Sequence, residues 1–163
     1  MYNNVMHSRL DILLVAGLTT MMGGVVMSFS LISAQAALRE EVIAAVTQTG
    51  EGINDIIAEK VKAAESIEAT ATTLILTMSD PDVNPTIIEL EEGRIRLTEG
   101  EKVSYLTEEA TAVANLRFLL LGKAEERSEG GIAVSFAVIG KAEGEIAPPM
   151  EYTQKFQATI SGE

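Results

Sequence analysis

The chain has 163 residues, enough for one domain, and a formal net charge of −12. A negative charge of this size repels nucleic acid and anionic lipid headgroups, which excludes both as specific partners. Cysteine is absent, so disulfides and thiolate metal sites are excluded as well.

The first predicted element is a helix that begins in a membrane. Residues 12–38 carry no charge, whereas residues 39–163 are dense in charged side chains. About 20 apolar residues in a helix cross the hydrocarbon core of a bilayer, and a helix satisfies its own backbone groups there. We therefore predict a short leader or cytoplasmic segment at 1–9 and the transmembrane half of a long helix at 10–38.

Charges and small residues around this run indicate its orientation and its packing. Arg9 precedes the run, and Arg39 after it is followed at once by two glutamates, which favours a cytoplasmic N-terminus and an acidic domain on the far side. Gly17, Gly23 and Gly24 lie within the run, where small residues let another helix approach closely. We predict a single-pass membrane protein with an extracytoplasmic C-terminal domain.

The same run contains a candidate signal-peptidase site. Ala34-Gln35-Ala36 has the A-x-A pattern and would place the mature N-terminus at Ala37. An apolar stretch about twice as long as the core of an ordinary signal peptide favours a retained anchor instead. Both interpretations stay open at this point.

From Arg39 onward the pattern becomes amphipathic, with no proline to end the helix. Apolar residues recur mostly at steps of three and four, which is the spacing of one helix face. The positions expected to pack are Val42, Val46, Ile53, Ile57 and Val61. Gly50 and Gly52 each cost about 1 kcal/mol relative to Ala in a helix, so we expect a bend or local weakening there. We predict the amphipathic half of the helix at 39–67.

After the helix the apolar pattern changes to a period of two, which predicts a β-rich extracytoplasmic domain at 68–163. The predicted strands are Thr73–Met78, Thr86–Leu90, Arg94–Thr98, Val113–Leu121, Ile132–Ile139 and Tyr152–Ile160. Ile132–Ile139 is apolar on both faces, which favours a central place in the sheet, and Gly93 predicts a hairpin. The amphipathic half of the helix can cover one face of such a meander. The expected fold class is therefore α+β, a long N-terminal helix packed on an antiparallel β-sheet.

One acidic stretch partly matches a calcium-binding loop. Asp80, Asp82, Asn84 and Glu91 stand at positions 1, 3, 5 and 12 of such a loop. Pro85 stands at the sixth position, where the loop needs Gly, and the flanking segments are predicted strands. We predict an ordinary β-connection, with these four residues as a weak calcium candidate and no other metal or cofactor.

Few residues are available for catalysis. The only histidine is His7, near the chain start, and without cysteine a nucleophile would be Ser or Thr with a carboxylate or lysine as its base. Glu91-Glu92 and Glu125-Glu126 are adjacent pairs, and adjacent strand residues point to opposite faces. These pairs are interpreted as turn or surface charge, and we predict that the chain is not an enzyme.

A long helix, lipid-embedded at its start and packed on an antiparallel sheet at its end, resembles the type IV pilin and type II secretion pseudopilin superfamily. The resemblance in layout covers nearly the whole chain. Leu10-Asp11-Ile12-Leu13 aligns with the family's apolar-acid-apolar start, which makes Asp11 the acid and His7 the first mature residue, with Met6 where the family has Gly. Downstream the elements follow the family's order: Ala64-Glu65-Ser66-Ile67 ends the helix, Thr73-Leu74-Ile75-Leu76-Thr77 opens the sheet, and Tyr152-Thr153-Gln154-Lys155-Phe156 belongs to its closing strand.

The resemblance implies a minor pilin or pseudopilin, a structural subunit of a type IV pilus or type II secretion-like filament that assembles by helix bundling. The implied partners are other pilin subunits, the inner-membrane assembly machinery and, before assembly, the lipid bilayer. Prepilin peptidase would cut between Met6 and His7, and Asp11 would pair with the N-terminal amine of a neighbouring subunit. The alternative is a secreted or membrane-tethered β-rich domain that binds a ligand or protein, its helix serving only as signal peptide or anchor.

Overall fold

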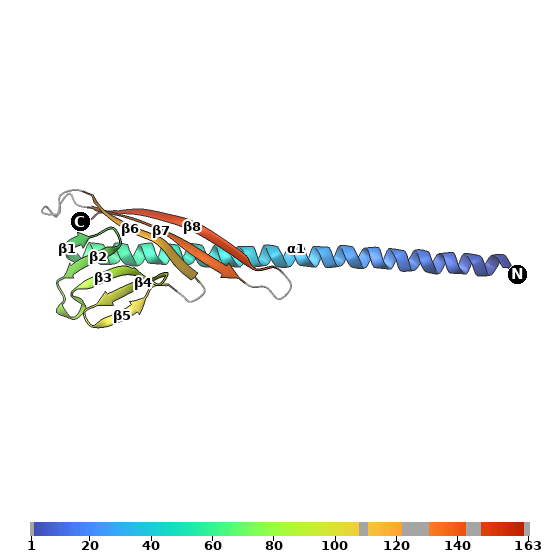
Figure 1. The fold of residues 1–163 in the computed structure, drawn as a ribbon, viewed down its shortest axis with the longest axis horizontal. Helices are drawn as coiled ribbons and strands as arrows, with labels where there is room; N and C mark the ends of the chain where they lie inside the picture. Colours follow the sequence, from blue (N-terminus) through green and yellow to red (C-terminus); the bar gives the residue numbers. More distant parts are fainter. Residues whose placement is uncertain (1, 108–110, 122–130, 143–147, 162–163) are drawn as a thin grey trace.

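One long helix, α1, forms the axis of the molecule. The computed structural model describes residues 2–107, 111–121, 131–142 and 148–161, with side chains from Asp11 onward. α1 runs from Tyr2 to Ala63, 62 residues and roughly 90 Å at 1.5 Å per residue. Figure 1 shows its N-terminal half projecting far beyond the strands. The helix therefore begins at Tyr2, before residue 10, where its start was predicted.

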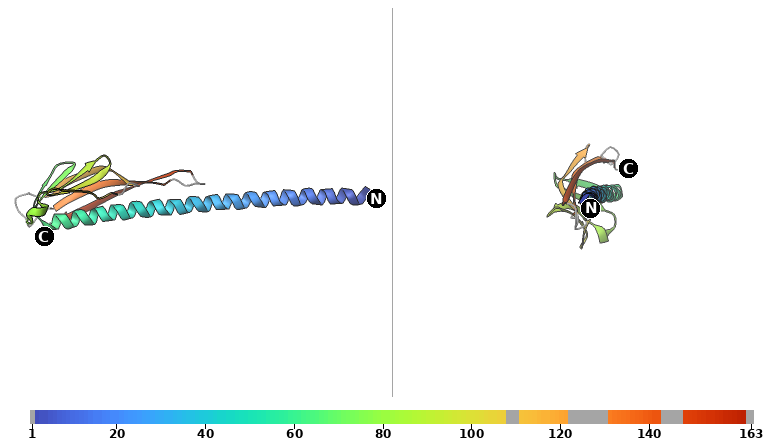
Figure 2. Two further views of the ribbon diagram at one scale, coloured as in Figure 1. Left: turned by 90° about the horizontal axis from the view of Figure 1, so that it is seen from below. Right: turned by 90° about the vertical axis from the view of Figure 1, so that its right-hand side faces the viewer.

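The bend expected at Gly50 and Gly52 is absent, because α1 is helical throughout and Figure 2 shows it nearly straight. Gly50 has a packing role instead: a Cβ atom there would overlap the ring of Phe156 from the last strand. Packing against the strands thus outweighs the low helix propensity of glycine.

The helix ends earlier than predicted. We expected Ala64-Glu65-Ser66-Ile67 to be helical, but α1 stops at Ala63 and β1 occupies Ala64–Ala69. β1 pairs antiparallel with β2 (Thr73–Met78), from Ala64 opposite Met78 to Ala69 opposite Leu74. Pairing with β2 gives the backbone of this segment its hydrogen bonds, so tertiary context overrides the helical pattern.

β1 and β2 belong to a five-stranded antiparallel meander, in the order β1-β2-β3-β4-β5. Its other strands are β3 (Thr86–Glu91), β4 (Arg94–Glu99) and β5 (Lys102–Tyr105). The predicted hairpin is confirmed: Glu92 and Gly93 connect β3 to β4 with φ of 49° and 80°, the positive values that a two-residue turn needs. β5 was not predicted.

The remaining strands form a second sheet, where a single sheet was expected. It is antiparallel, in the order β6-β7-β8, with β6 at Thr111–Leu121, β7 at Gly131–Ala142 and β8 at Met150–Ser161. β7 is central, as the apolar stretch Ile132–Ile139 predicted. A bulge at Asn115, where φ is 57°, lets Val113 and Leu116 both point inward.

The core lies between α1 and the two sheets. The five helix positions predicted to pack are all 0–3% exposed: Val42, Val46, Ile53, Ile57 and Val61. The backbone of β7 touches the helix at Gly140, where a Cβ atom would lie 2.5 Å from Val46 Cγ2. Figure 2 shows the strands lying along one side of α1, so the helix covers the inner faces of the sheets as expected.

Two polar contacts fix the helix to the sheets. Lys60 Nζ lies 2.7 Å from Glu99 Oε1 of β4, and the Thr47 hydroxyl donates to Gln154 Oε1 of β8 at 3.1 Å. One contact reaches each sheet. The amphipathic half of α1 is therefore held on both of them.

Candidate functional site

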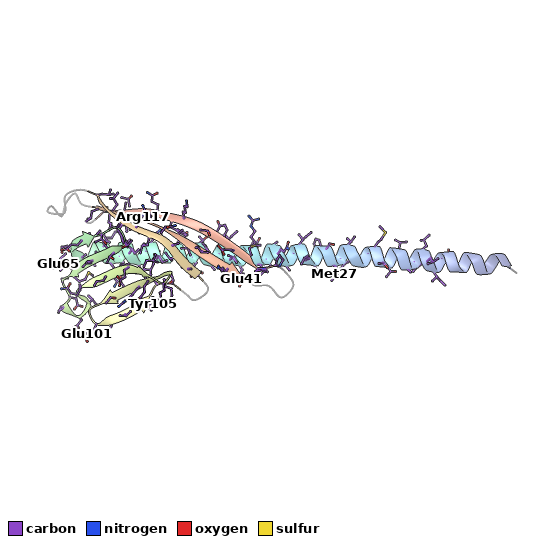
Figure 3. All side chains as sticks on the ribbon, viewed as in Figure 1. Met27, Glu41, Glu65, Glu101, Tyr105 and Arg117 are labelled. Atoms are coloured by element: carbon purple, nitrogen blue, oxygen red, sulfur yellow. The ribbon has the colours of Figure 1, made fainter. Side chains whose placement is uncertain are left out.

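Residues 12–32 of α1, called here the exposed apolar segment, are left uncovered by the fold. Their large apolar side chains are 37–77% exposed. α1 is long and apolar enough to cross a membrane. Figure 3 shows side chains such as Met27 standing out from the helix with no strand beside them. Soluble monomers rarely expose a contiguous apolar surface of this size, so lipid or other protein has to cover it.

The predicted assembly residues lie on this segment or at its edge. Asp11 is exposed and directly precedes it. Gly17, Gly23 and Gly24 have no heavy atom within 4 Å of the position a Cβ would take. Gly17 and Gly24 are seven residues apart, about two turns, and so share one helix face. This face has no side chains at two positions, which would let the backbone of another helix come close.

The two predicted processing sites both lie within α1. The structure describes the backbone of Met6 and His7, which is helical. Ala34, Gln35 and Ala36 are helical too, with no break on either side. The backbone structure is therefore the same at both sites and does not distinguish between them.

The structure does not bring the four calcium candidates together. Asp80 caps the short 3-10 helix η1 (Pro81–Val83) by accepting from Asp82 N at 3.0 Å. Asn84 Oδ1 accepts from the backbone N–H of Met78 at 3.1 Å. Glu91 lies at the far end of β3 and is bound there by other side chains.

Within the described ranges no three His, Asp or Glu side chains gather as metal ligands. The acidic stretch after β2 is a β-connection. Glu91 and Glu92 sit at the β3–β4 turn, and Glu125 and Glu126 lie outside the described residues.

Sequence reasoning missed a polar cluster on the outer side of the five-stranded sheet. The Tyr105 hydroxyl donates to Glu91 Oε2 at 2.8 Å, and Arg96 Nη1 donates to Glu91 Oε1 at 3.1 Å. The Arg94 guanidinium lies 4.2 Å from the centroid of the Tyr105 ring and donates to the Thr107 carbonyl at 3.3 Å. The hydrogen bond to Glu91 is the main reason that the pKa of Tyr105 is raised.

The signal for this cluster was in the alternation of charges along two strands. Glu89 and Arg96 face each other in the β3–β4 register, and Arg96 faces Tyr105 in the β4–β5 register. Opposite charges placed directly across a sheet attract. Arg94 Nε, Arg96 Nε and Thr107 Oγ1 of this cluster are buried without a hydrogen-bond partner among the described residues. Its other contacts tie the short strand β5 to the sheet, so we assign it a structural role.

The described part of the chain thus defines a class of protein: an α+β protein whose single helix is membrane-length at its start and packed on antiparallel sheets at its end. The chain matches no protein-family model, no curated protein and no solved structure. Its function has to be argued from the geometry alone.

Proposed function

We propose that this chain is a structural subunit of a type IV pilus or type II secretion-like filament, a minor pilin or pseudopilin, and that its subunits assemble by bundling their helices. The observation that carries the proposal is the exposed apolar segment. The helix residues buried in the core of the domain lie between Val42 and Val61, whereas the large apolar side chains of residues 12–32 are exposed.

The apolar surface of the first half of α1 has to be covered both inside and outside a bilayer. Inside a bilayer, lipid tails cover the exposed apolar segment and helices associate through close packing at small residues. Outside a bilayer, the same surface would have to be buried at about 25 cal/mol per Å² of apolar area. Identical segments from neighbouring subunits can provide that burial if the helices lie side by side. A bundle of helices with the sheets arranged around it satisfies this requirement.

Asp11 is assigned the role of aligning neighbouring helices. A carboxylate at the edge of an apolar run is costly in lipid unless it finds a partner. In a bundle, the N-terminal amine of an adjacent subunit could supply the opposite charge. The subunit would wait in the inner membrane with its domain outside the cytoplasm, and the assembly machinery would extract it.

Cysteine cross-linking tests the bundle directly, because the natural chain contains no cysteine. Gly17→Cys and Gly24→Cys, each introduced alone in the full chain and expressed with the assembly machinery, should give disulfide-linked dimers on oxidation. Ser104→Cys, on the exposed strand β5, is the control and should stay monomeric. Surface filaments that contain the chain should be visible by immunogold microscopy.

Mass spectrometry of the mature N-terminus separates this function from that of a secreted binding domain. A chain that starts at or before His7 keeps the exposed apolar segment and supports the proposal. A chain that starts at Ala37 lacks the segment, cannot bundle, and would overturn the proposal in favour of a secreted binding domain.

A further inference from the structure

The outer face of the three-stranded sheet, turned away from α1, carries small side chains along residues 131–137 of its middle strand, with the larger Ile139 beyond them. Its side chains follow from the strand register: Ala112, Ala114, Arg117, Leu119 and Leu121 from β6, Ala133, Ser135, Ala137, Ile139 and Lys141 from β7, and Glu151, Thr153, Lys155, Gln157 and Thr159 from β8. Ala133 and Ser135 lie between the longer side chains of Leu119 and Arg117 on β6 and Thr159 and Gln157 on β8, which makes a trough along this part of β7. A depression of about 370 Å³ over Arg117, Ser135 and Gln157 occupies part of this trough.

The outer face is basic, although the whole chain is strongly acidic. Arg117 and Lys155 are exposed, and neither forms an ion pair with any residue that the structure describes. Figure 3 shows Arg117 on the outer side of β6, away from α1. In the described part of this face the acid is Glu151, which pairs with Lys141 at 3.4 Å. Two free cations therefore flank the trough, one on each edge strand.

The opposite side of the molecule carries the complementary charge. Glu51, Asp55 and Glu59 are exposed on α1 at four-residue steps, and none of them has an ion-pair partner among the described residues. Asp55 lies about 200° around the helix from the buried Ile53. This acidic stripe, defined as Glu51, Asp55 and Glu59, thus points directly away from the sheets.

We propose that the acidic stripe of one copy of this chain docks in the trough on the outer face of another copy. The spacing of the charges fits. Arg117 and Lys155 are two strands apart, about 10 Å, and offset by two residues, about 7 Å, along the strands. Successive acids of the stripe are about 6 Å apart along α1. A helix lying along β7 would therefore meet one cation on each side, one turn apart.

The small side chains of β7 add a steric reason for a helix as the occupant. Ala133 and Ser135 are small and partly exposed, so a helix can lie over them without displacing large groups. Figure 1 shows β7 and β8 running at a shallow angle to α1, so a docked helix can be nearly parallel to the helix of its host.

The two surfaces face in opposite directions, so the contact is head-to-tail and leaves both ends of a pair free. Such heterologous contacts build rings or helical filaments. This inference rests on the proposed function in part, since it names the second contact that would hold the filament together besides the helix bundle.

A pair of cysteines on the two surfaces tests the contact. Asp55→Cys and Ser135→Cys in one full-length chain lie on opposite sides of the molecule, with α1 and the sheet between them, so they cannot join within one copy. Oxidation of this double variant in membrane vesicles should give a ladder of dimers, trimers and longer species. Asp55→Cys combined with Ser104→Cys is the matched control and should give no ladder. A missing ladder from the first pair, or an equal ladder from the control, would overturn the proposal.

Charge reversal tests the basis of the contact. Arg117→Glu with Lys155→Glu in the cysteine-pair chain should lower the yield of the ladder roughly tenfold, because two attractions become repulsions. Adding Glu51→Lys and Glu59→Lys to the same chain should restore the ladder. Lys102→Glu on the exposed strand β5 changes the net charge without touching either surface and should leave the yield unchanged. An unchanged ladder in the doubly reversed chain would contradict the inference.

The two proposals fail in different ways. Normal filaments from the Arg117→Glu, Lys155→Glu chain would overturn the docking inference and leave helix bundling intact. A ladder in vesicles from a chain that never enters filaments in cells would overturn the proposed function and support the docking contact as a separate self-association.

Discussion

At the scale of single residues, two glycines decide how closely α1 and the three-stranded sheet approach each other. Gly50 of α1 faces the ring of Phe156, and that ring stacks on Phe136 at a centroid distance of 5.4 Å. Gly140 of β7 plays the same part from the sheet side, against Val46. Because neither glycine has a Cβ atom, the stacked phenylalanine rings can pack closely on α1, and the backbone of β7 can approach α1 closely.

Gly50 and Gly52 should respond in opposite ways to alanine. Gly50→Ala introduces a Cβ atom into the space of the Phe156 ring, and overpacking costs roughly 1–3 kcal/mol, which exceeds the gain in helix propensity. Gly52 has free space at its Cβ position, so Gly52→Ala should raise the free energy of unfolding by up to about 1 kcal/mol. Thermal unfolding of the full chain in detergent, followed by circular dichroism, measures both. Equal effects would show that the ring does not pack on Gly50.

Tyr105 should titrate at a higher pH than an ordinary tyrosine. Its neutral hydroxyl donates to Glu91, and this bond raises the pKa above 10.0. The contribution of the bond to stability is therefore complete below about pH 10 and is lost as the pH rises through the higher folded-state pKa. Ultraviolet absorbance of tyrosinate, compared between the natural chain and Tyr105→Phe, gives the value. Glu91→Gln should move the Tyr105 pKa back toward 10.0, and a pKa that stays raised in that variant would contradict the assignment.

At the scale of elements, α1 combines two helices with different surroundings in one continuous rod. The amphipathic half, which packs on the sheets, has a narrow apolar stripe, whereas the half before it is apolar on all sides. The first pattern is typical of a helix packed on one side, and the second of a helix surrounded by lipid or by other helices. The structure agrees with both patterns. In the amphipathic half the buried residues are those of the stripe, and in residues 12–32 the large apolar side chains are exposed.

Truncating side chains in the two halves should therefore separate stability from assembly. Ile57 is 0% exposed, and Ile57→Ala should lower the free energy of unfolding of the domain by about 2–4 kcal/mol. Ile32 is 63% exposed, and Ile32→Ala should change it by less than about 0.5 kcal/mol. Chemical denaturation in detergent measures both. A large loss for Ile32→Ala would mean that the domain contacts the exposed apolar segment.

The helix and the strands with alternating burial were predictable from the sequence, whereas three further features were not. β1 lacks a strong pattern because Ala64, Ile67 and Ala69 are only partly buried, and the pairing with β2 decides its structure. β5 has no buried residue at all, so no hydrophobic signal marks it. The split into two sheets depends on which strands pair, and periodicity within a strand contains no information about its partner.

Part of the candidate site could likewise be predicted from the sequence, and part could not. The exposed apolar segment and its glycines were visible in the sequence, because an uncharged run of this length is typical of a membrane-spanning helix. The basic outer face was not visible, because Arg117 and Lys155 are distant in sequence and come together only through the registers of β6 and β8 with β7. The calcium candidate failed because Glu91 sits at the far end of a strand from the other three residues.

At the scale of the whole molecule, the hydrophobic core of the domain does not include the exposed apolar segment. Every buried residue of the hydrophobic core lies at position 42 or later. A chain that begins at Ala37 should therefore retain the β-rich domain, with a melting temperature within a few degrees of the full chain, as expected for loss of residues that make no core contact.

Far-ultraviolet circular dichroism and calorimetry of the shortened chain test this prediction. The shortened chain should also no longer partition into liposomes, whereas the full chain should. A domain that unfolds when residues 1–36 are removed would show that the projecting helix contributes to its stability.

The order of elements along the chain has a consequence for biosynthesis. β8 is made long after α1, yet it supplies the Phe156 ring that covers Gly50 and the Gln154 group that binds Thr47. While the ribosome is still producing β6 and β7, β8 does not yet cover the amphipathic stripe of the newly made helix. A nascent chain stalled before β7 would also expose Val42 and Val46, which pack on Gly140 of that strand, and quality-control proteases could degrade it at that stage.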